Sequence, residues 1–213
     1  MANPRLSVID ESNRGDHYHL IPTDICYYLY EYTSHRGYTF SSTNGLISNL
    51  KKKPSQPGQY YKEQAITTCA HALRQALNPN WLASATLVPV PGSKALGHPE
   101  RDDRMERVCQ QMGQPSPDVR SLIIQTQSTT ASHEAAPGDR ITVDALRALY
   151  TIDEALTVPA PQAIAIVDDV LTAGTHYRAM HSTLTARFPE IPIIGVFVAR
   201  RVFPDDPMVA DAF

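Results

Sequence analysis

Two adjacent acidic residues, Asp168 and Asp169, directly follow a uniformly apolar run and precede a segment of small residues. Ionised carboxylates only accept hydrogen bonds, so this pair suits a vicinal diol such as the 2′- and 3′-hydroxyls of a ribose. The small residues suit a phosphate, because a close turn at a helix start presents backbone N–H groups to an anion. Together the two features indicate a phosphorylated sugar, whereas an Asp-Asp pair alone is also typical of a capped polar turn. The small segment consists of Thr172, Ala173, Gly174 and Thr175.

A second candidate loop follows an earlier strand-like run at residues 85–90. Its lysine supplies a point charge for an anion, although an ordinary turn ending in a surface lysine has the same composition. Residues 101–104 indicate a charged first helical turn, from which Arg104 could reach this loop. The loop consists of Pro91, Gly92, Ser93 and Lys94.

A long polar stretch, residues 127–140, is typical of a functional or disordered loop. Its most chemically capable members are Ser128, His133 and Arg140. Arg140 suits pyrophosphate oxygens, with a salt bridge beside a helix as the alternative. His133 suits catalysis, with a solvated loop histidine as the alternative.

The elements that must position these residues follow from hydrophobic patterning. Continuous apolar runs predict buried strands, and apolar residues at helical spacing predict amphipathic helices. Their alternation predicts an α/β fold with an open, mostly parallel sheet flanked by helices, in which ligands bind beyond the carboxyl ends of the strands. The expected strands are 85–90, 119–126, 163–167 and 193–199, and the expected helices are 60–77, 101–112, 143–150 and 175–188.

The N-terminal quarter differs in composition, because eight of the ten tyrosines fall between Tyr18 and Tyr61. A run of three lysines, two prolines and a glycine at residues 51–58 then indicates a loop. The lysines are typical of a solvated turn, with a phosphate or nucleic-acid contact as the alternative. We therefore expect a Tyr-rich appendage at residues 1–58, a core at residues 59–203 and a tail at residues 204–213.

Composition excludes several classes of function. A net charge of −3 over 213 residues argues against a general nucleic-acid binder. The cysteines, Cys26, Cys69 and Cys109, form no C-x-x-C pair, which favours a reducing compartment over a disulfide framework or a zinc site. The longest apolar run, residues 193–199, is too short to cross a bilayer, and the N-terminus has no apolar secretory segment. We expect a cytoplasmic protein with no membrane partner.

The sequence VDDVLTAGT at residues 167–175 resembles the phosphoribosyl pyrophosphate (PRPP) signature of type I phosphoribosyltransferases. The resemblance implies a Rossmann-like core with residues 1–58 as a hood-like appendage. It also implies that Asp168 and Asp169 hold the ribose hydroxyls, contacting metal only indirectly, and that residues 172–175 form the 5′-phosphate loop. Residues 91–94 would receive pyrophosphate, and a closing loop at residues 127–140 would exclude water.

The mechanism that this resemblance implies is attack by a nitrogen nucleophile on the anomeric carbon of the ribose as magnesium pyrophosphate leaves. Lys94, His133 and Arg140 are then the candidate catalytic residues, and Mg²⁺ is the expected cofactor. The expected partners are PRPP and a nitrogenous acceptor, either a base or an amine. Because members of the family are commonly dimers, the resemblance also implies a homodimer.

The acceptor is not identified by the sequence. Thr172 stands where 6-oxopurine enzymes carry an acidic residue, and no lysine follows Lys94, unlike the closing loop of orotate enzymes. The order of motifs is most similar to ComF-like phosphoribosyltransferase-like proteins, although the cysteine zinc module with which those often open has no counterpart here. Three functions stay open: an active transferase, a non-catalytic PRPP or nucleotide sensor and, ranked last, a nucleic-acid-handling module.

Overall fold

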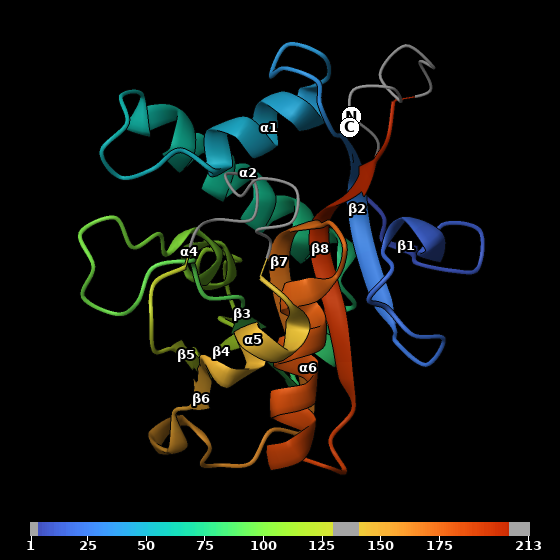
Figure 1. Ribbon diagram of the computed structural model, residues 1–213, viewed down its shortest axis with the longest axis vertical. Coiled ribbons are helices and arrows are strands. Elements are labelled where there is room, and N and C mark those ends of the chain that lie inside the picture. Colours follow the sequence, from blue (N-terminus) through green and yellow to red (C-terminus); the bar gives the residue numbers. More distant parts are fainter. Residues whose placement is uncertain (1–3, 130–140, 205–213) are drawn as a thin grey trace.

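The structure is a computed structural model that describes residues 4–129 and 141–204. Within these residues six strands form one sheet flanked by helices, which confirms the expected α/β class (Figure 1). Neighbouring strands run parallel except at one edge, where β1 and β2 are antiparallel. In spatial order the strands are β1 (Ser7–Val8), β2 (Cys26–Thr33), β8 (Ile193–Val202), β7 (Ala163–Leu171), β3 (Ala85–Pro89) and β4 (Asp118–Val119).

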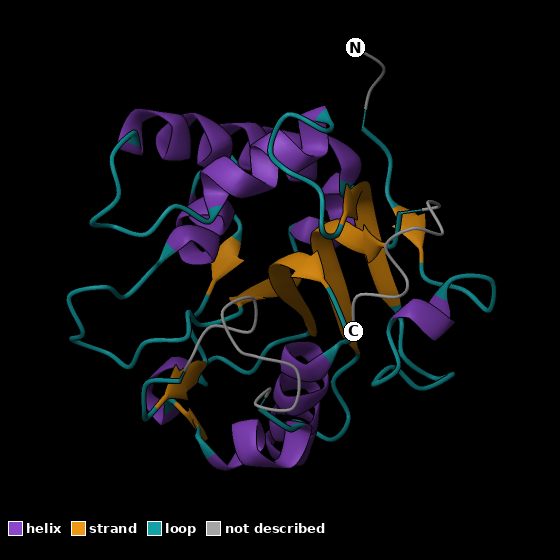
Figure 2. Ribbon diagram, turned by 45° about the horizontal axis from the view of Figure 1, so that its top comes forward, coloured by secondary structure: helices purple, strands orange, loops and turns teal. Residues whose placement is uncertain are grey.

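The helices cover both faces of the sheet (Figure 2). Strand β7 illustrates why the sheet needs helices on both faces. Alternate residues of a strand point to opposite faces, and this strand has apolar residues on both. Its Val167 packs in the cluster that contains α2 and α4, and its Ile166 packs in the cluster that contains α6. One face carries α1 (Ser42–Leu50), α2 (Gln59–Ala76) and α4 (Arg104–Gln110), and the other carries α5 (Val143–Ala148) and α6 (Thr175–Arg187). The short α3 (Pro79–Leu82) and two 3₁₀ turns, η1 (Arg14–Asp16) and η2 (Glu154–Leu156), complete the helical elements described.

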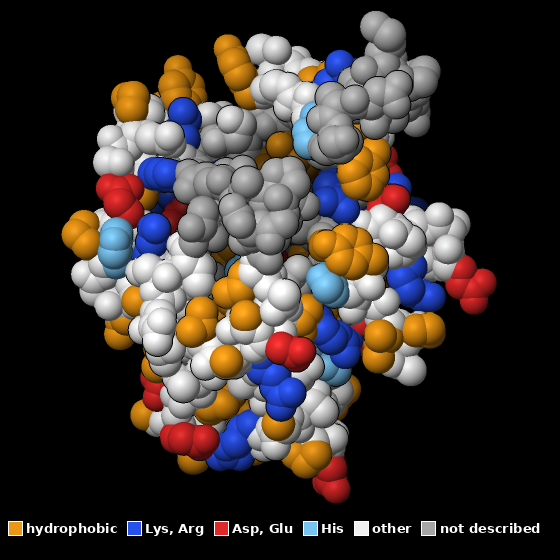
Figure 3. Space-filling model, viewed as in Figure 1, with side chains coloured by type: hydrophobic (Ala, Val, Ile, Leu, Met, Phe, Trp, Pro, Cys, Tyr) orange, Lys and Arg blue, Asp and Glu red, His pale blue; other side chains and the backbone are white. Residues whose placement is uncertain are grey.

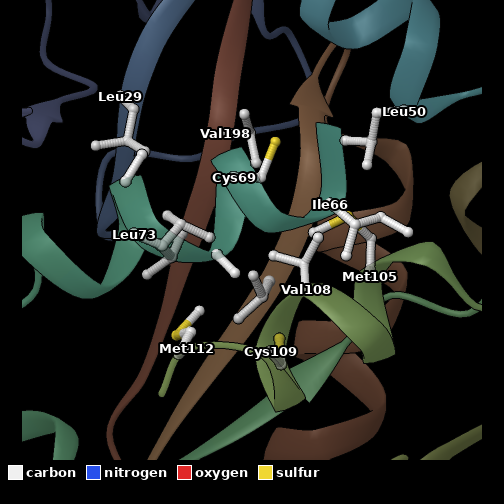
Figure 4. Packing of buried hydrophobic residues seen from close by; sticks show 14 of the residues in the cluster. Leu29, Leu50, Ile66, Cys69, Leu73, Met105, Val108, Cys109, Met112 and Val198 are labelled. Carbon is white, nitrogen blue, oxygen red and sulfur yellow. The ribbon is translucent and has the colours of Figure 1, made fainter. Parts of the chain in front are cut away.

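Helix α2 confirms the amphipathic helix expected at residues 60–77, because its apolar side chains pack in the core on this face of the sheet. Figure 4 shows Ile66, Cys69 and Leu73 of α2 pointing toward α4 and the sheet, and all three are fully buried. The partner side chains include Val108 from α4 and Val198 from β8. The spacing of the three α2 residues, i, i+3 and i+7, places them on one helical stripe.

The prediction of a single strand at residues 119–126 is wrong. It is divided between β4 in the main sheet and β5 (Ile123–Gln125), which pairs antiparallel with β6 (Tyr150–Ile152) in a separate two-stranded sheet. Arg120 lies at the break: its backbone N–H still donates to the Leu87 carbonyl of β3 at 2.9 Å, and its guanidinium donates to Asp118 and to the carbonyl oxygens of Leu156 and Pro159, in the segment after β6. These bonds link the end of β4 to the segment that follows the small sheet.

Residues 26–33, within the expected appendage, form β2 of the main sheet. Strand β2 pairs in parallel with β8 over most of its length, and its Cys26 is fully buried against Gly195 of that strand. Tyrosines favour strands, and here they contribute to the sheet and its packing. In the parts of the chain described, no helix is long and apolar enough to cross a membrane.

Candidate functional site

The two predicted ligand loops leave neighbouring parallel strands at the carboxyl edge of the sheet. Strand β3 pairs in parallel with β7, with Pro89 opposite Val167, and the Val90 N–H donates to the Val167 carbonyl at 2.9 Å. The loop at residues 91–94 leaves this edge from β3, and the loop at residues 172–174 leaves it from β7. The parallel arrangement therefore brings together two segments that are far apart in the sequence.

The acidic pair lies within β7, which extends past the expected end at Val167 to Leu171. Adjacent residues of a strand point to opposite faces. Asp169 points to the face that carries α1 and α4, where its partners lie. Asp168 acts electrostatically on Tyr150, which is buried in the cluster on the α6 face. The two carboxylates consequently occupy different environments.

Two cations hold Asp169, whose side chain is 4% exposed. Arg104 donates to Oδ2 from Nε at 2.8 Å and from Nη2 at 2.6 Å. Lys51 Nζ lies 3.1 Å from Oδ1. Burial by itself raises the pKa of Asp169, but the opposite charges of Arg104 and Lys51 outweigh it and hold that pKa below its usual range. Asp169 is thus ionised and paired in this structure.

Asp168 is half-buried, and its Oδ1 accepts a hydrogen bond from the Asp169 backbone N–H at 2.8 Å. Burial and, next, the negative charge of Asp169 raise the pKa of Asp168 above its usual range. The charges of Arg104 and Lys51 offset this effect only in part. Because Asp168 keeps some exposure, it is the better placed of the two carboxylates to accept hydrogen bonds from a bound molecule.

The ion pairs at Asp169 continue as an alternating network through the α1–α4 layer. Arg104 Nη1 lies 2.6 Å from Asp102 Oδ2, and Lys62 Nζ lies 2.8 Å from Asp102 Oδ1. Lys62 also donates to the Lys52 carbonyl at 2.6 Å, although it is only 3% exposed. Sequence reasoning named Arg104 but assigned no such role to Lys51, Asp102 or Lys62. The run of lysines at residues 51–53 is the only feature of the sequence that pointed to a charged contact from this segment. Lys51 is paired with Asp169 and does not simply lie in a solvated turn.

The segment at residues 172–174 connects β7 to α6 with a backbone that requires glycine. Gly174 has φ +89°, and a Cβ atom there would lie 3.2 Å from Leu20 Cδ2. The carbonyl of Thr172 accepts from His17 Nδ1, and that of Ala173 accepts from the His19 N–H at 3.0 Å. The N-terminal segment therefore supports this turn through its carbonyl groups.

The loop at residues 91–94 packs directly on the start of α4. A Cβ atom on Gly92 would lie 2.7 Å from the Asp102 carbonyl oxygen, so only glycine fits this approach. The Ser93 carbonyl accepts from Gln125 Nε2 at 2.9 Å and from the Thr129 N–H at 2.7 Å. Gly92 thus places the loop next to the residues that anchor Arg104.

Lys94 does not join the aspartates. Its Nζ lies 3.5 Å from the Thr129 carbonyl oxygen. Together with Arg101 and the buried Gln125 it lines a pocket of about 280 Å³ beside the small sheet, and neither aspartate lines this pocket. Lys94, expected to supply a positive charge for pyrophosphate, thus lies at a pocket that neither Asp168 nor Asp169 lines, and its role stays a prediction.

Tyr150 and His176 form a hydrogen-bonded pair next to the acidic residues. Tyr150 OH lies 2.9 Å from His176 Nδ1, and His176 is the second residue of α6. Burial lowers the pKa of His176 to about 4, so the imidazole is neutral near neutral pH. Sequence reasoning gave neither residue a role, although His176 directly follows the small-residue segment.

The polar stretch after β5 is described only at its start. Ser128 Oγ accepts from the Ala95 N–H at 3.1 Å, which ties the stretch to the loop that follows β3. His133 and Arg140 lie outside the described residues.

The donor set at the acidic pair does not form a metal site by itself. No group of three or more His, Cys, Asp or Glu side chains with metal-binding geometry occurs among the residues described. Asp169 is moreover paired with Arg104 and Lys51. These residues fit an indirect role, in which Mg²⁺ is held mainly by phosphate oxygens of a bound molecule.

Comparison of the sequence with protein-family models finds no match, and comparison with curated proteins finds none either.

Proposed function

We propose that the protein binds PRPP and transfers its ribose 5-phosphate to a nitrogenous acceptor, releasing pyrophosphate. The observation that carries the proposal is the carboxyl edge of β3 and β7, where the half-buried Asp168 lies in β7 and a glycine-dependent loop leaves each of the two neighbouring strands. In open α/β sheets this edge is the usual place for a ligand. The resemblance of residues 167–175 to the PRPP signature adds the identity of the ligand.

Each part of the edge has a role in this proposal. Asp168 accepts hydrogen bonds from the ribose hydroxyls, and residues 172–175 surround the 5′-phosphate. Residues 91–94 lie toward the pyrophosphate. In the reaction a bond forms between the acceptor nitrogen and C1′, the bond between C1′ and the pyrophosphate oxygen breaks with its electron pair going to pyrophosphate, and the acceptor nitrogen releases its proton to solvent. If Mg²⁺ is bound with the ligand, it would supply positive charge that offsets the negative charge of the departing pyrophosphate.

A non-catalytic PRPP or nucleotide sensor is the second candidate, favoured by the pairing of Asp169. In this structure Arg104 and Lys51 occupy a carboxylate that a transferase of this type would use for the ribose. A sensor needs only binding, so it tolerates such pairing. A nucleic-acid-handling role ranks below both, because Lys and Arg side chains of the described residues are interspersed with acidic ones on the face shown in Figure 3.

The test is calorimetric titration of PRPP with Mg²⁺ into the wild type and into Asp168→Asn. We expect saturable binding that weakens about tenfold or more in the variant, because hydrogen bonds to a charged acceptor contribute roughly 1.5–3 kcal/mol. Glu190→Gln is the control. This exposed carboxylate lies in the turn before β8, at the amino ends of the parallel strands and away from the carboxyl edge that carries Asp168. Absence of binding to the wild type would refute the proposal.

A pyrophosphate-release assay against a panel of purine, pyrimidine and amine acceptors then separates the two candidates. Release that depends on one acceptor identifies a transferase and names its substrate. PRPP binding without release from any acceptor identifies the sensor.

A further inference from the structure

We propose that Arg104 and Lys51 are the cations that receive the diphosphate group of the ligand, and that its arrival releases Asp169 for the sugar. This inference rests on the proposed function and deepens it. It assigns the anion site to two residues outside the loops at residues 91–94 and 127–140, and it gives Asp169 two alternative partners.

The exposure of the three groups supports this exchange. The side chains of Arg104 and Lys51 are 20% and 26% exposed, whereas that of Asp169 is 4% exposed. An anion that approaches from solvent therefore meets the cations before the carboxylate. Arg104 uses three of its five N–H groups on Asp169 and Asp102, so its planar fork has donors left for phosphate oxygens.

The charge balance of the network also favours an anion. Three cations, Lys51, Lys62 and Arg104, face two paired carboxylates, Asp102 and Asp169. Asp168, whose pKa is raised, adds less than a full negative charge near its titration range. The network therefore has an excess of positive charge in a partly buried location, where Coulomb attraction to a phosphate is stronger than in water.

The position of the two cations matches the diphosphate rather than the 5′-phosphate. Arg104 begins α4 two residues after Asp102, and the Asp102 carbonyl is the atom against which Gly92 packs. Lys51 reaches Asp169 from the end of α1, on the same face of the sheet. The small-residue turn at residues 172–174 instead leads into α6, which covers the other face. A sugar bound at Asp168 would thus have its two phosphate groups directed to different layers.

Inorganic pyrophosphate with Mg²⁺ is the probe that isolates this site, because it lacks the sugar. By calorimetry we expect Arg104→Gln to weaken its binding about tenfold or more, and Lys51→Gln to weaken it several-fold. Asp169→Asn should tighten pyrophosphate binding several-fold, because the cations lose the competing carboxylate. The same variant should weaken binding of PRPP, which also needs Asp169 for its ribose.

Arg187→Gln is the matched control, because Arg187 is paired with Glu154 far along α6 from its N-terminal turn. Arg104→Gln leaves a buried carboxylate with one cation fewer, so circular dichroism must first show that it is folded. If it is not, Lys51→Gln and Asp169→Asn decide the question, because Lys51 is more exposed and asparagine keeps the shape of aspartate.

The outcomes separate this inference from the proposed function. Wild type that binds PRPP, with pyrophosphate affinity unchanged in Lys51→Gln and not raised in Asp169→Asn, overturns the exchange and leaves the PRPP proposal standing. Wild type that binds pyrophosphate but not PRPP, with the expected variant pattern, keeps the anion site and refutes the transferase. Wild type that binds neither refutes both.

Discussion

Neighbouring carboxylates in β7 acquire opposite properties from the helices packed on each face of the sheet. Arg104 and Lys51 lie against Asp169 and lower its pKa, which favours its ionised form. Burial and the negative charge of Asp169 raise the pKa of Asp168, which disfavours its ionised form. Shifts of pKa in opposite directions within one pair are typical of functional sites, although structural ion-pair networks produce them too. In the proposed function the ribose hydroxyls donate to the ionised form of Asp168, so PRPP affinity, measured by calorimetry, should rise as the pH increases through the titration of this group.

His176 provides a residue-scale prediction for acid stability. Burial lowers its pKa from 6.5 to about 4, so between these values the unfolded chain takes up a proton that the folded protein does not. The free energy of unfolding should therefore fall as the pH drops from 6.5 to 4, with His176 contributing on the order of 1–3 kcal/mol. Urea unfolding at several pH values should show a shallower fall in His176→Gln than in the wild type.

Two other histidines, His17 and His181, also contribute to the acid sensitivity. Burial also lowers the pKa of His17 and of His181, so part of the acid sensitivity should persist in the variant. His71→Gln, at an exposed position of α2, should keep the wild-type slope. Identical slopes in His176→Gln and His71→Gln would contradict the prediction.

At the scale of elements, the sequence predicts best where hydrophobic patterning alone decides the structure. The stripe of α2 and the doubly buried β7 and β8 are examples, since each has apolar residues at the spacing its element requires. At the division of residues 119–126, by contrast, Arg120 binds carbonyl groups more than 30 residues away in the sequence, and no local pattern contains such partners. The acidic pair was located from its residue types, but its partners Lys51 and Arg104 are brought to it only by the packing of α1 and α4.

The loop between β3 and α4 provides a prediction at this scale. Gly92→Ala places a Cβ atom 2.7 Å from the Asp102 carbonyl oxygen, a backbone atom that cannot rotate away. The loop must shift, and we expect a loss of about 1–3 kcal/mol in the free energy of unfolding. Urea unfolding measures this loss. Because the shift also moves Asp102, which anchors Arg104, pyrophosphate binding should weaken in the same variant.

Gly37→Ala is the control for this substitution, since a Cβ atom there meets no atom within 4 Å. It should change the free energy of unfolding by no more than about 0.5 kcal/mol. If the two variants unfold at the same urea concentration, the loop has room to adjust, and its contact with α4 does not restrain it.

For the whole molecule, the N-terminal segment is part of both the sheet and the site. Strand β2 pairs with β8 in the main sheet. His17 and His19 donate to the carbonyl oxygens of residues 172 and 173, and Lys51 forms an ion pair with Asp169. Composition distinguishes this segment by its tyrosines but does not indicate that its strand pairs with β8, the last strand among the described residues. Such long-range parallel pairing leaves no local signal in the sequence.

Removal of residues 1–58 is therefore expected to abolish cooperative folding rather than release an independent core. The truncated chain would expose the edge of β8 and uncover apolar side chains that β2 and α1 bury against the sheet and α2. The side chains lost include Cys26, Tyr28, Leu29, Ile47 and Leu50. Thermal unfolding followed by near-ultraviolet circular dichroism should show a sharp transition for the full chain and none for residues 59–213. A sharp transition of the truncated chain within a few degrees of the full chain would instead establish residues 1–58 as a separable appendage.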